Sequence, residues 1–240
     1  MQWFKFNIVR EQRAVGTAEA LWEAVTTGIG GWLWPQEIEP REGGLVDEGA
    51  GIVEAWEPPR HLATIAEGPD GWFNRLDFDL RAGDAGHRVL RYTHAGVVPE
   101  EDAHVVADIE RHTEFYLDAF RRYVEHFAGL PVTYTHVEAR GSGDEPEAFE
   151  VLLTRLGLGD EDIPGERLHV DLPDGRTEVV IDYHDHYFLG LRTDTALYRF
   201  FGRNRFGASV GLAIHDFSGT RDAADLTRAG QEFLDRLYGA

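Results

Sequence analysis

The sequence contains no cysteine and a single lysine, Lys5, among its 240 residues. The absence of cysteine excludes disulfides, thiolate zinc sites and cysteine nucleophiles. Because no second lysine is present, Schiff-base chemistry, including attachment of pyridoxal phosphate, is excluded everywhere except at Lys5. Long hydrophobic runs are also missing, so we expect no transmembrane helix. The amino-terminal residues lack the basic segment and apolar stretch of a secretion signal, and we therefore expect a cytoplasmic protein.

Basic residues are outnumbered, and the net charge is −20 at pH 7. A field of this sign repels phosphate backbones and anionic membrane surfaces, so neither nucleic acid nor a membrane is expected as a partner. Hydrophobic residues make up 42% of the chain, which is enough to build a core and excludes a disordered chain. The sequence also lacks a Gly-x-Ser-x-Gly elbow, a P-loop and a dinucleotide fingerprint. We therefore predict no catalytic residues and no cofactor.

Residues 1–129 follow the order of an α+β fold with an antiparallel sheet. Residues 2–11 alternate in polarity and predict a first strand. A helix is predicted to begin after Thr17, a good N-cap residue, and to end at Gly28. A later strand has one apolar and one polar face, and a glycine turn at residues 83–86 follows it. The residues of its two faces are Leu76, Phe78 and Leu80 on one side and Arg75, Asp77 and Asp79 on the other.

The long segment from Ala103 to Gly129 predicts an amphipathic helix that closes the first half. Its apolar positions recur at spacings of three and four, which is the period of one helix face. These positions are Ile109, Thr113, Tyr116, Phe120, Tyr123 and Phe127.

Residues 130–240 repeat the same order of elements. A strand is followed by a helix that we expect Asp144 to cap and Gly157 and Gly159 to end. Two strands are predicted around a Pro-Asp-Gly turn, and the last helix is predicted from Asp222 to Tyr238. The repetition indicates either a degenerate internal duplication or two unrelated α+β segments. We predict a domain boundary between residues 129 and 130.

Several motifs of the first half occur in the order of one known superfamily. They are "ALWEAVTTG", "WLWP", "GIVEAWEPPRHLA", "LRYTHAGV" and "HTEFYLDAFRRYVEHF". In this order they resemble the START-like helix-grip superfamily (SRPBCC), and within it proteins akin to the activator of Hsp90 ATPase. The second half shows the order but few of the motifs, and resembles a divergent unit of the same kind. The resemblance implies an antiparallel sheet wrapped around a long C-terminal helix, with a largely apolar cavity between them. It also implies two such units in tandem.

The resemblance implies three functions, of which we favour the binding of a hydrophobic or aromatic small molecule without catalysis. One alternative is an Hsp90-type co-chaperone, because the acidic charge suits a basic protein partner. Another is a polyketide cyclase-like enzyme in which Arg91 or His94 polarises a carbonyl. The predicted ligand-binding residues are Trp34, Trp56, Phe78, Tyr92, His94, Phe115, Tyr116 and Phe120.

The stretch "VVIDYHDHYFLGLRTD" suggests a metal site. On a strand, Asp182, His184 and His186 would share one face, and His215 from a later strand could join them. The other interpretation is an edge strand with polar residues on both faces. We predict no metal site and keep these four residues as the candidates to test.

The tract "RFFGRNRFGASV" is locally basic on an acidic chain. It contains Arg199, Arg203 and Arg205. We expect such a patch to receive either an anionic ligand or the acidic first domain of the chain.

Overall fold

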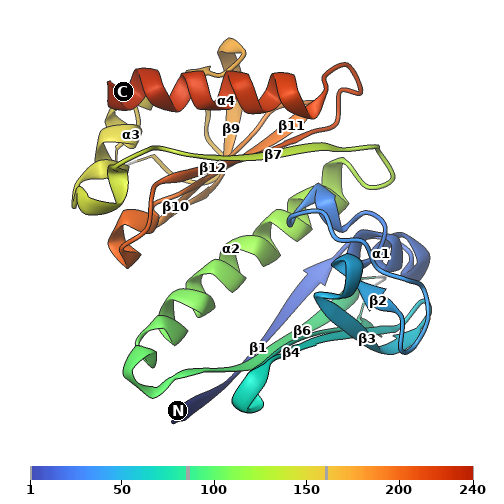
Figure 1. The fold of residues 1–240 in the computed structure, drawn as a ribbon. Helices are drawn as coiled ribbons and strands as arrows, with labels where there is room; N and C mark the ends of the chain where they lie inside the picture. Colours follow the sequence, from blue (N-terminus) through green and yellow to red (C-terminus); the bar gives the residue numbers. More distant parts are fainter. Residues whose placement is uncertain (1, 85–86, 160–161, 240) are drawn as a thin grey trace. The chain divides into compact units, whose positions relative to one another are not determined.

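The structure, a computed structural model, describes residues 2–84, 87–159 and 162–239. The chain forms two compact units, Met1–Leu130 and Pro131–Ala240. Each unit contains a six-stranded antiparallel sheet with α-helices on one of its faces (Figure 1). This confirms the predicted α+β class and the helix-grip arrangement, with two such units in tandem. No helix in the described ranges is long and apolar enough to cross a membrane.

The sheet of the first unit has the strand order β1-β6-β5-β4-β3-β2. Figure 1 shows the long helix α2 running across one face of this sheet. The predicted turn between β5 and β6 includes residues 85–86, which lie outside the described residues. The elements are β1 (Trp3–Ala14), α1 (Ala18–Val25), β2 (Leu45–Val46), β3 (Gly51–Glu57), β4 (His61–Glu67), β5 (Phe73–Ala82), β6 (Arg88–Pro99) and α2 (Val105–His126).

Local sequence explains the helices of the first unit. The Thr17 side chain accepts a hydrogen bond from the Ala20 N–H, as its N-cap position predicts. Helix α2 ends at His126, close to the predicted limit. Its apolar stripe turns Phe120 and Tyr123 into the interior, where both are buried.

The strand pairing sorts the first sheet into an inner face, which α2 covers, and an outer face. Phe78 lies opposite Tyr92, and Leu76 lies opposite His94, so these four residues share the inner face. Asp77, which lies between Leu76 and Phe78, belongs to the outer face, as its polar side chain predicts.

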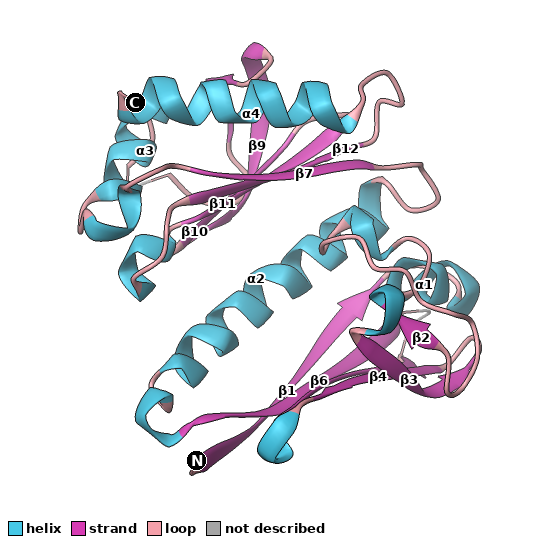
Figure 2. Ribbon diagram, in the orientation of Figure 1, coloured by secondary structure: helices cyan, strands magenta, loops and turns pink. Residues whose placement is uncertain are grey.

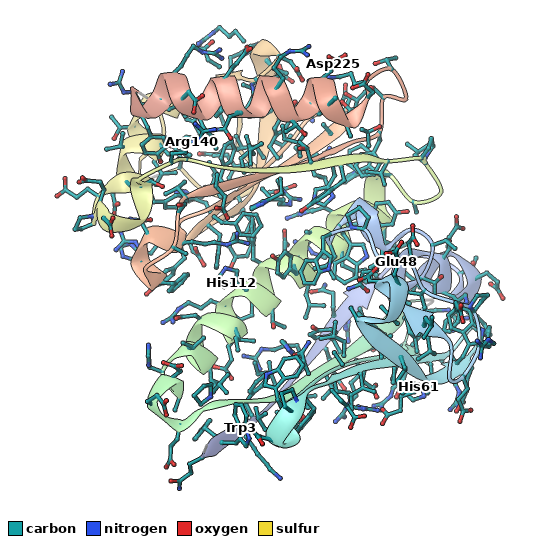
Figure 3. The ribbon with its side chains drawn as sticks, viewed as in Figure 1. Trp3, Glu48, His61, His112, Arg140 and Asp225 are labelled. Carbon is teal, nitrogen blue, oxygen red and sulfur yellow. The ribbon has the colours of Figure 1, made fainter. Side chains whose placement is uncertain are left out.

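Ion pairs connect the polar side chains of the outer face. Arg75 pairs with Asp77 at 2.8 Å and also with Glu54. His61 lies 3.2 Å from Asp77. Figure 3 labels His61 on the side of the sheet away from α2. A partly exposed network of this kind is a solvated surface, and such pairs contribute little to stability.

The sheet of the second unit has the order β7-β12-β11-β10-β9-β8. Figure 2 shows helix α4 lying along its sheet. Gly230 brings α4 close to β7, since a Cβ there would lie 3.1 Å from Val137. The elements are β7 (Thr133–Glu138), α3 (Ala148–Leu156), β8 (Arg167–Leu172), β9 (Gly175–His184), β10 (Phe188–Arg192), β11 (Ala196–Phe201), β12 (Gly211–Asp216) and α4 (Ala223–Tyr238).

Helix α3 begins later than the sequence predicts. Asp144 lies in a separate 3-10 turn, Ser142–Asp144, and Glu147 occupies the N-cap position. The predicted end is confirmed, because Gly157 closes the helix with a φ of +75°. The last helix is confirmed, with Asp222 as its N-cap residue, which accepts a hydrogen bond from the Asp225 N–H.

Candidate functional site

The centre of the first unit is a closely packed aromatic core. The Trp32 ring lies 5.2 Å from Phe120 and 6.4 Å from Phe78, edge-on in both cases. Its indole N–H donates to the Ala24 carbonyl at 2.8 Å. All three rings are buried. Offset and edge-on contacts of this kind favour a rigid core, so this part of the space under α2 is filled by side chains.

A different environment lies on the inner face towards the start of β5. Here the ring nitrogen Nε2 of His94 lies 2.6 Å from the Asn74 side-chain oxygen. The His94 ring lies edge-on to Phe6 at 5.1 Å and 6.4 Å from Tyr92. His94, Asn74 and Tyr92 keep intermediate exposure although they point towards the helix side. We call Phe6, Asn74, Tyr92, His94 and Tyr116 the His94 cluster.

Tyr116 brings helix α2 into the cluster, and Trp34 lies at its rim. The Tyr116 and Trp34 rings are edge-on, with centroids 5.8 Å apart. Trp34 is 42% exposed, whereas Trp32 points inward. His112, labelled on α2 in Figure 3, lies 6.4 Å from the Tyr116 ring.

Burial favours the neutral forms of His94 and Tyr92. It lowers the pKa of His94 to about 4, because a charged imidazolium is poorly solvated there. Burial, and secondly the nearby Tyr116, raise the pKa of Tyr92. With the amide oxygen of Asn74 as acceptor, Nε2 of His94 carries the proton and Nδ1 keeps a lone pair. The cluster therefore offers a hydrogen-bond acceptor and phenolic donors among aromatic rings.

The lowered pKa of His94 predicts a loss of stability in mild acid. The unfolded chain binds a proton at His94 from about pH 6.5 downward, whereas the folded chain does so only near pH 4. His94 therefore does not reduce the free energy of unfolding above pH 6.5, but it reduces this free energy increasingly as the pH drops towards 4. Urea unfolding between pH 5 and 6.5 checks this, since most carboxylates do not titrate there. A His94→Leu variant that retains the whole pH dependence would contradict the assignment.

The remaining predicted ligand-binding residues are spread over other parts of the first unit. Trp56 lies edge-on to Trp22 of α1, 5.0 Å away. Phe78 and Phe120 belong to the central core. Phe115 is one position from Tyr116, and therefore about 100° around the helix from it. The structure thus brings together Tyr92, His94 and Tyr116, with Trp34 beside them.

Two residues of the cluster, Phe6 and Asn74, are missing from the sequence-based list. Asn74 is in phase with Leu76 and Phe78 on β5, and this alternation could have placed it on the inner face. Arg91 lies opposite Asp79 and Glu11. It therefore belongs to the outer face, and the predicted role for Arg91 at an inner carbonyl is wrong.

The candidate metal ligands do not meet. An irregularity in the pairing of β9 with β10, at Gly190 and Leu191, puts Asp182 and His184 on different faces. His184 Nδ1 lies 2.8 Å from the Asp162 carbonyl oxygen, and His186 is exposed beyond the end of β9.

His215 is also remote from these residues. It lies on β12, which β11 and β10 separate from β9, a distance of roughly 14 Å at about 4.8 Å per strand. In the part of the chain that the structure describes, no group of three or more His, Asp or Glu side chains could hold a metal ion.

The basic tract is neutralised by its neighbours. Arg199 forms a two-bond ion pair with Asp182, with distances of 2.8 and 3.1 Å. Arg203 lies 3.6 Å from Glu138 and over the Phe201 ring. Arg205 forms an ion pair with Glu150, a residue of helix α3. The expected basic surface patch is therefore not formed.

Comparisons with known proteins give only distant structural likenesses. No family model matches the chain, and no curated protein matches it. DynU16, a putative protein in the dynemicin biosynthetic locus, is 15% identical, and the match covers 98% of this chain and 95% of that one with a TM-score of 0.40.

Other solved structures match about half of the chain. CalU16 from Micromonospora echinospora is 22% identical over 49% of this chain and 75% of that one, with a TM-score of 0.41. Aha1 from Colwellia psychrerythraea, solved as a dimer, is 15% identical over 50% of this chain and 96% of that one, with a TM-score of 0.39. At these identities and TM-scores the likenesses carry no information about activity.

Proposed function

We propose that the protein binds a hydrophobic or aromatic small molecule at the His94 cluster and does not alter it chemically. The observation that supports this most is the His94–Asn74 pair, with its 2.6 Å contact, on the inner face of the sheet among aromatic rings. Burying such polar groups costs stability that an apolar core would not lose. Ligand sites, by contrast, combine apolar walls with a few oriented polar groups.

The geometry favours an aromatic ligand that carries a hydroxyl or carbonyl group. The Nδ1 lone pair of His94 accepts a hydrogen bond from a ligand hydroxyl, and the phenols of Tyr92 and Tyr116 donate to a carbonyl. The Trp34 ring, exposed at the rim, provides a surface on which a ligand ring can stack.

The protonation state of His94 favours binding over acid–base catalysis. A general base works best when its pKa is near the working pH, whereas burial lowers the pKa of His94 to about 4. Arg91, the other residue predicted to polarise a carbonyl, lies on the outer face. A cyclase-like reaction at this cluster would therefore need another acid or base.

We expect the full-length protein to bind 1-naphthol more tightly than naphthalene in calorimetric titrations. Replacing His94 by leucine removes one hydrogen bond of roughly 1 kcal/mol and weakens 1-naphthol binding by about fivefold to tenfold, but leaves naphthalene binding unchanged. His61→Leu is the matched control, because this histidine lies on the outer face of the same sheet. The proposal fails if neither probe binds saturably, or if His61→Leu weakens 1-naphthol binding as much as His94→Leu.

A further inference from the structure

A pocket of about 420 Å³ lies in a notch of the second sheet. Strand β10 pairs only with the part of β9 from Val180 to His184. The earlier part of β9, from Gly175 to Val179, is paired with β8 alone. The notch lies beside this part, where β10 would have continued. Its volume is within the range of about 300–1,000 Å³ that is typical of small-ligand sites.

Both walls of the notch carry both signs of charge. Arg167 and Glu178 line the wall of β8 and β9, where they form an exposed ion pair of 3.0 Å. Arg192 and Asp194 line the wall formed by the end of β10 and the turn after it. Hydroxyl groups of Thr177, Thr193 and Thr195 also line the notch.

Tyr198 forms part of the lining from the interior of the unit. It is buried, and its hydroxyl donates to the Asp174 carboxylate at 2.9 Å. Burial, and secondly the charge of Asp174, raise the pKa of Tyr198, so this hydroxyl stays protonated. Arg221 also pairs with Asp174. The Asp174 charge is therefore compensated within the protein.

The exposed edge of β9 adds main-chain groups to the notch. Main-chain groups alternate in direction along an antiparallel strand. Ile181 exchanges hydrogen bonds with Gly165 and Glu166, on the β8 side. By this alternation, the N–H and C=O of Glu178 point to the opposite side, towards the notch. They are placed to pair with the main chain of an extended ligand.

We propose that the notch binds a short peptide with free termini. The open part of β9, from Gly175 to Val179, is roughly 16 Å long at about 3.3 Å per residue, which limits the occupant to a few residues. Its main chain pairs with Glu178, and its ammonium and carboxylate groups meet the acidic and basic side chains of the walls. Walls of balanced charge suit such a zwitterion, whereas a simple anion would also meet Glu178 and Asp194. This site is independent of the His94 cluster.

Triglycine titrated into the ¹⁵N-labelled full-length protein tests the proposal. We expect saturable shifts of the amide signals of Glu178, Thr193 and Thr195. Arg167→Ala is expected to weaken binding by about threefold to tenfold, because a charged hydrogen-bond donor is lost. Arg176→Ala is the matched control, since Arg176 lies on the same hairpin with similar side-chain exposure, 65% against 66%, but does not line the notch.

Three results would overturn the proposal. The first is the absence of saturable shifts at the notch. The second is equal binding of triglycine with acetylated and amidated ends, which would show that the termini are not recognised. The third is the same shifts with succinate or phosphate at equal affinity, which would identify a general anion site.

Discussion

Replacing Asp182 by alanine is expected to destabilise the protein by about 3–5 kcal/mol, because the buried Arg199 guanidinium then lacks this carboxylate. Both side chains of the pair are almost fully buried, at 1% and 2% exposure, and two hydrogen bonds join them. The backbone is adapted to the pair, since a Cβ at Gly190 would collide with Asp182 and lie 2.7 Å from Arg199. Urea unfolding of the full-length variant measures the loss.

Two further variants separate the burial of the pair from ion pairing in general. The double variant Asp182→Leu with Arg199→Met removes both charges and is expected to recover most of the lost stability. Glu178→Ala breaks the exposed pair with Arg167 and is expected to cost at most about 1 kcal/mol. An Asp182→Ala variant as stable as Glu178→Ala would show that the buried pair does not act as described.

The second large effect is expected at Trp32. Trp32→Ala removes a buried ring that contacts Phe120 and Phe78, and the expected loss is about 3–5 kcal/mol, as for other large core truncations. Trp34→Ala is the matched control, because the same residue type two positions away is 42% exposed. Its expected effect on stability is about 0.5 kcal/mol.

For Trp34, the expected effect on ligand binding is large although its expected effect on stability is small. Trp34→Ala is expected to weaken 1-naphthol binding although the fold is intact, because the exposed ring at the rim is lost. Urea unfolding and calorimetric titration of the same samples separate the two roles. Equal destabilisation by the two substitutions would mean that the rim and the core are not distinct.

Sequence periodicity predicted the elements whose packing is regular. The spacing of Tyr116, Phe120 and Tyr123 indicated α2, and the alternation of Leu76 with Asp77 assigned the faces of β5. Both predictions are correct because one side of each element packs against the core and the other side does not. Apolar residues therefore recur with a period of 3.6 in the helix and of 2 in the strand.

The second unit was harder to predict, because its sheet departs from simple alternation. The strands β10 and β11 are almost continuously buried, and such short apolar runs have no period that marks their faces. The sequence also gives no sign of the irregular strand pairing at Gly190. A regular strand would place Asp182 and His184 on one face, and this is why they were predicted to lie together. The ion pair of Asp182 with Arg199 joins residues 17 positions apart, and strand register alone creates it.

The composition of the candidate site was only partly predictable. Tyr92, His94 and Tyr116 were expected from the resemblance, which implies a pocket between the last strand of the first half and its long helix. The contact between His94 and Asn74 depends on the register of β5 against β6, which places Asn74 opposite Gly96, two residues from His94. A Cβ at Gly96 would lie 2.8 Å from the Phe6 ring, so the glycine leaves room for this ring beside His94. The co-chaperone alternative stays a prediction from the resemblance.

The most direct test of ligand binding at the His94 cluster is side-chain NMR of the full-length protein during titration with 1-naphthol. The account predicts saturable shifts of the His94 ring and the Asn74 side-chain amide, together with nuclear Overhauser contacts from the probe to Tyr92 and Tyr116. Saturable binding that leaves the His94 and Asn74 signals unchanged, with probe contacts elsewhere in the protein, would contradict it.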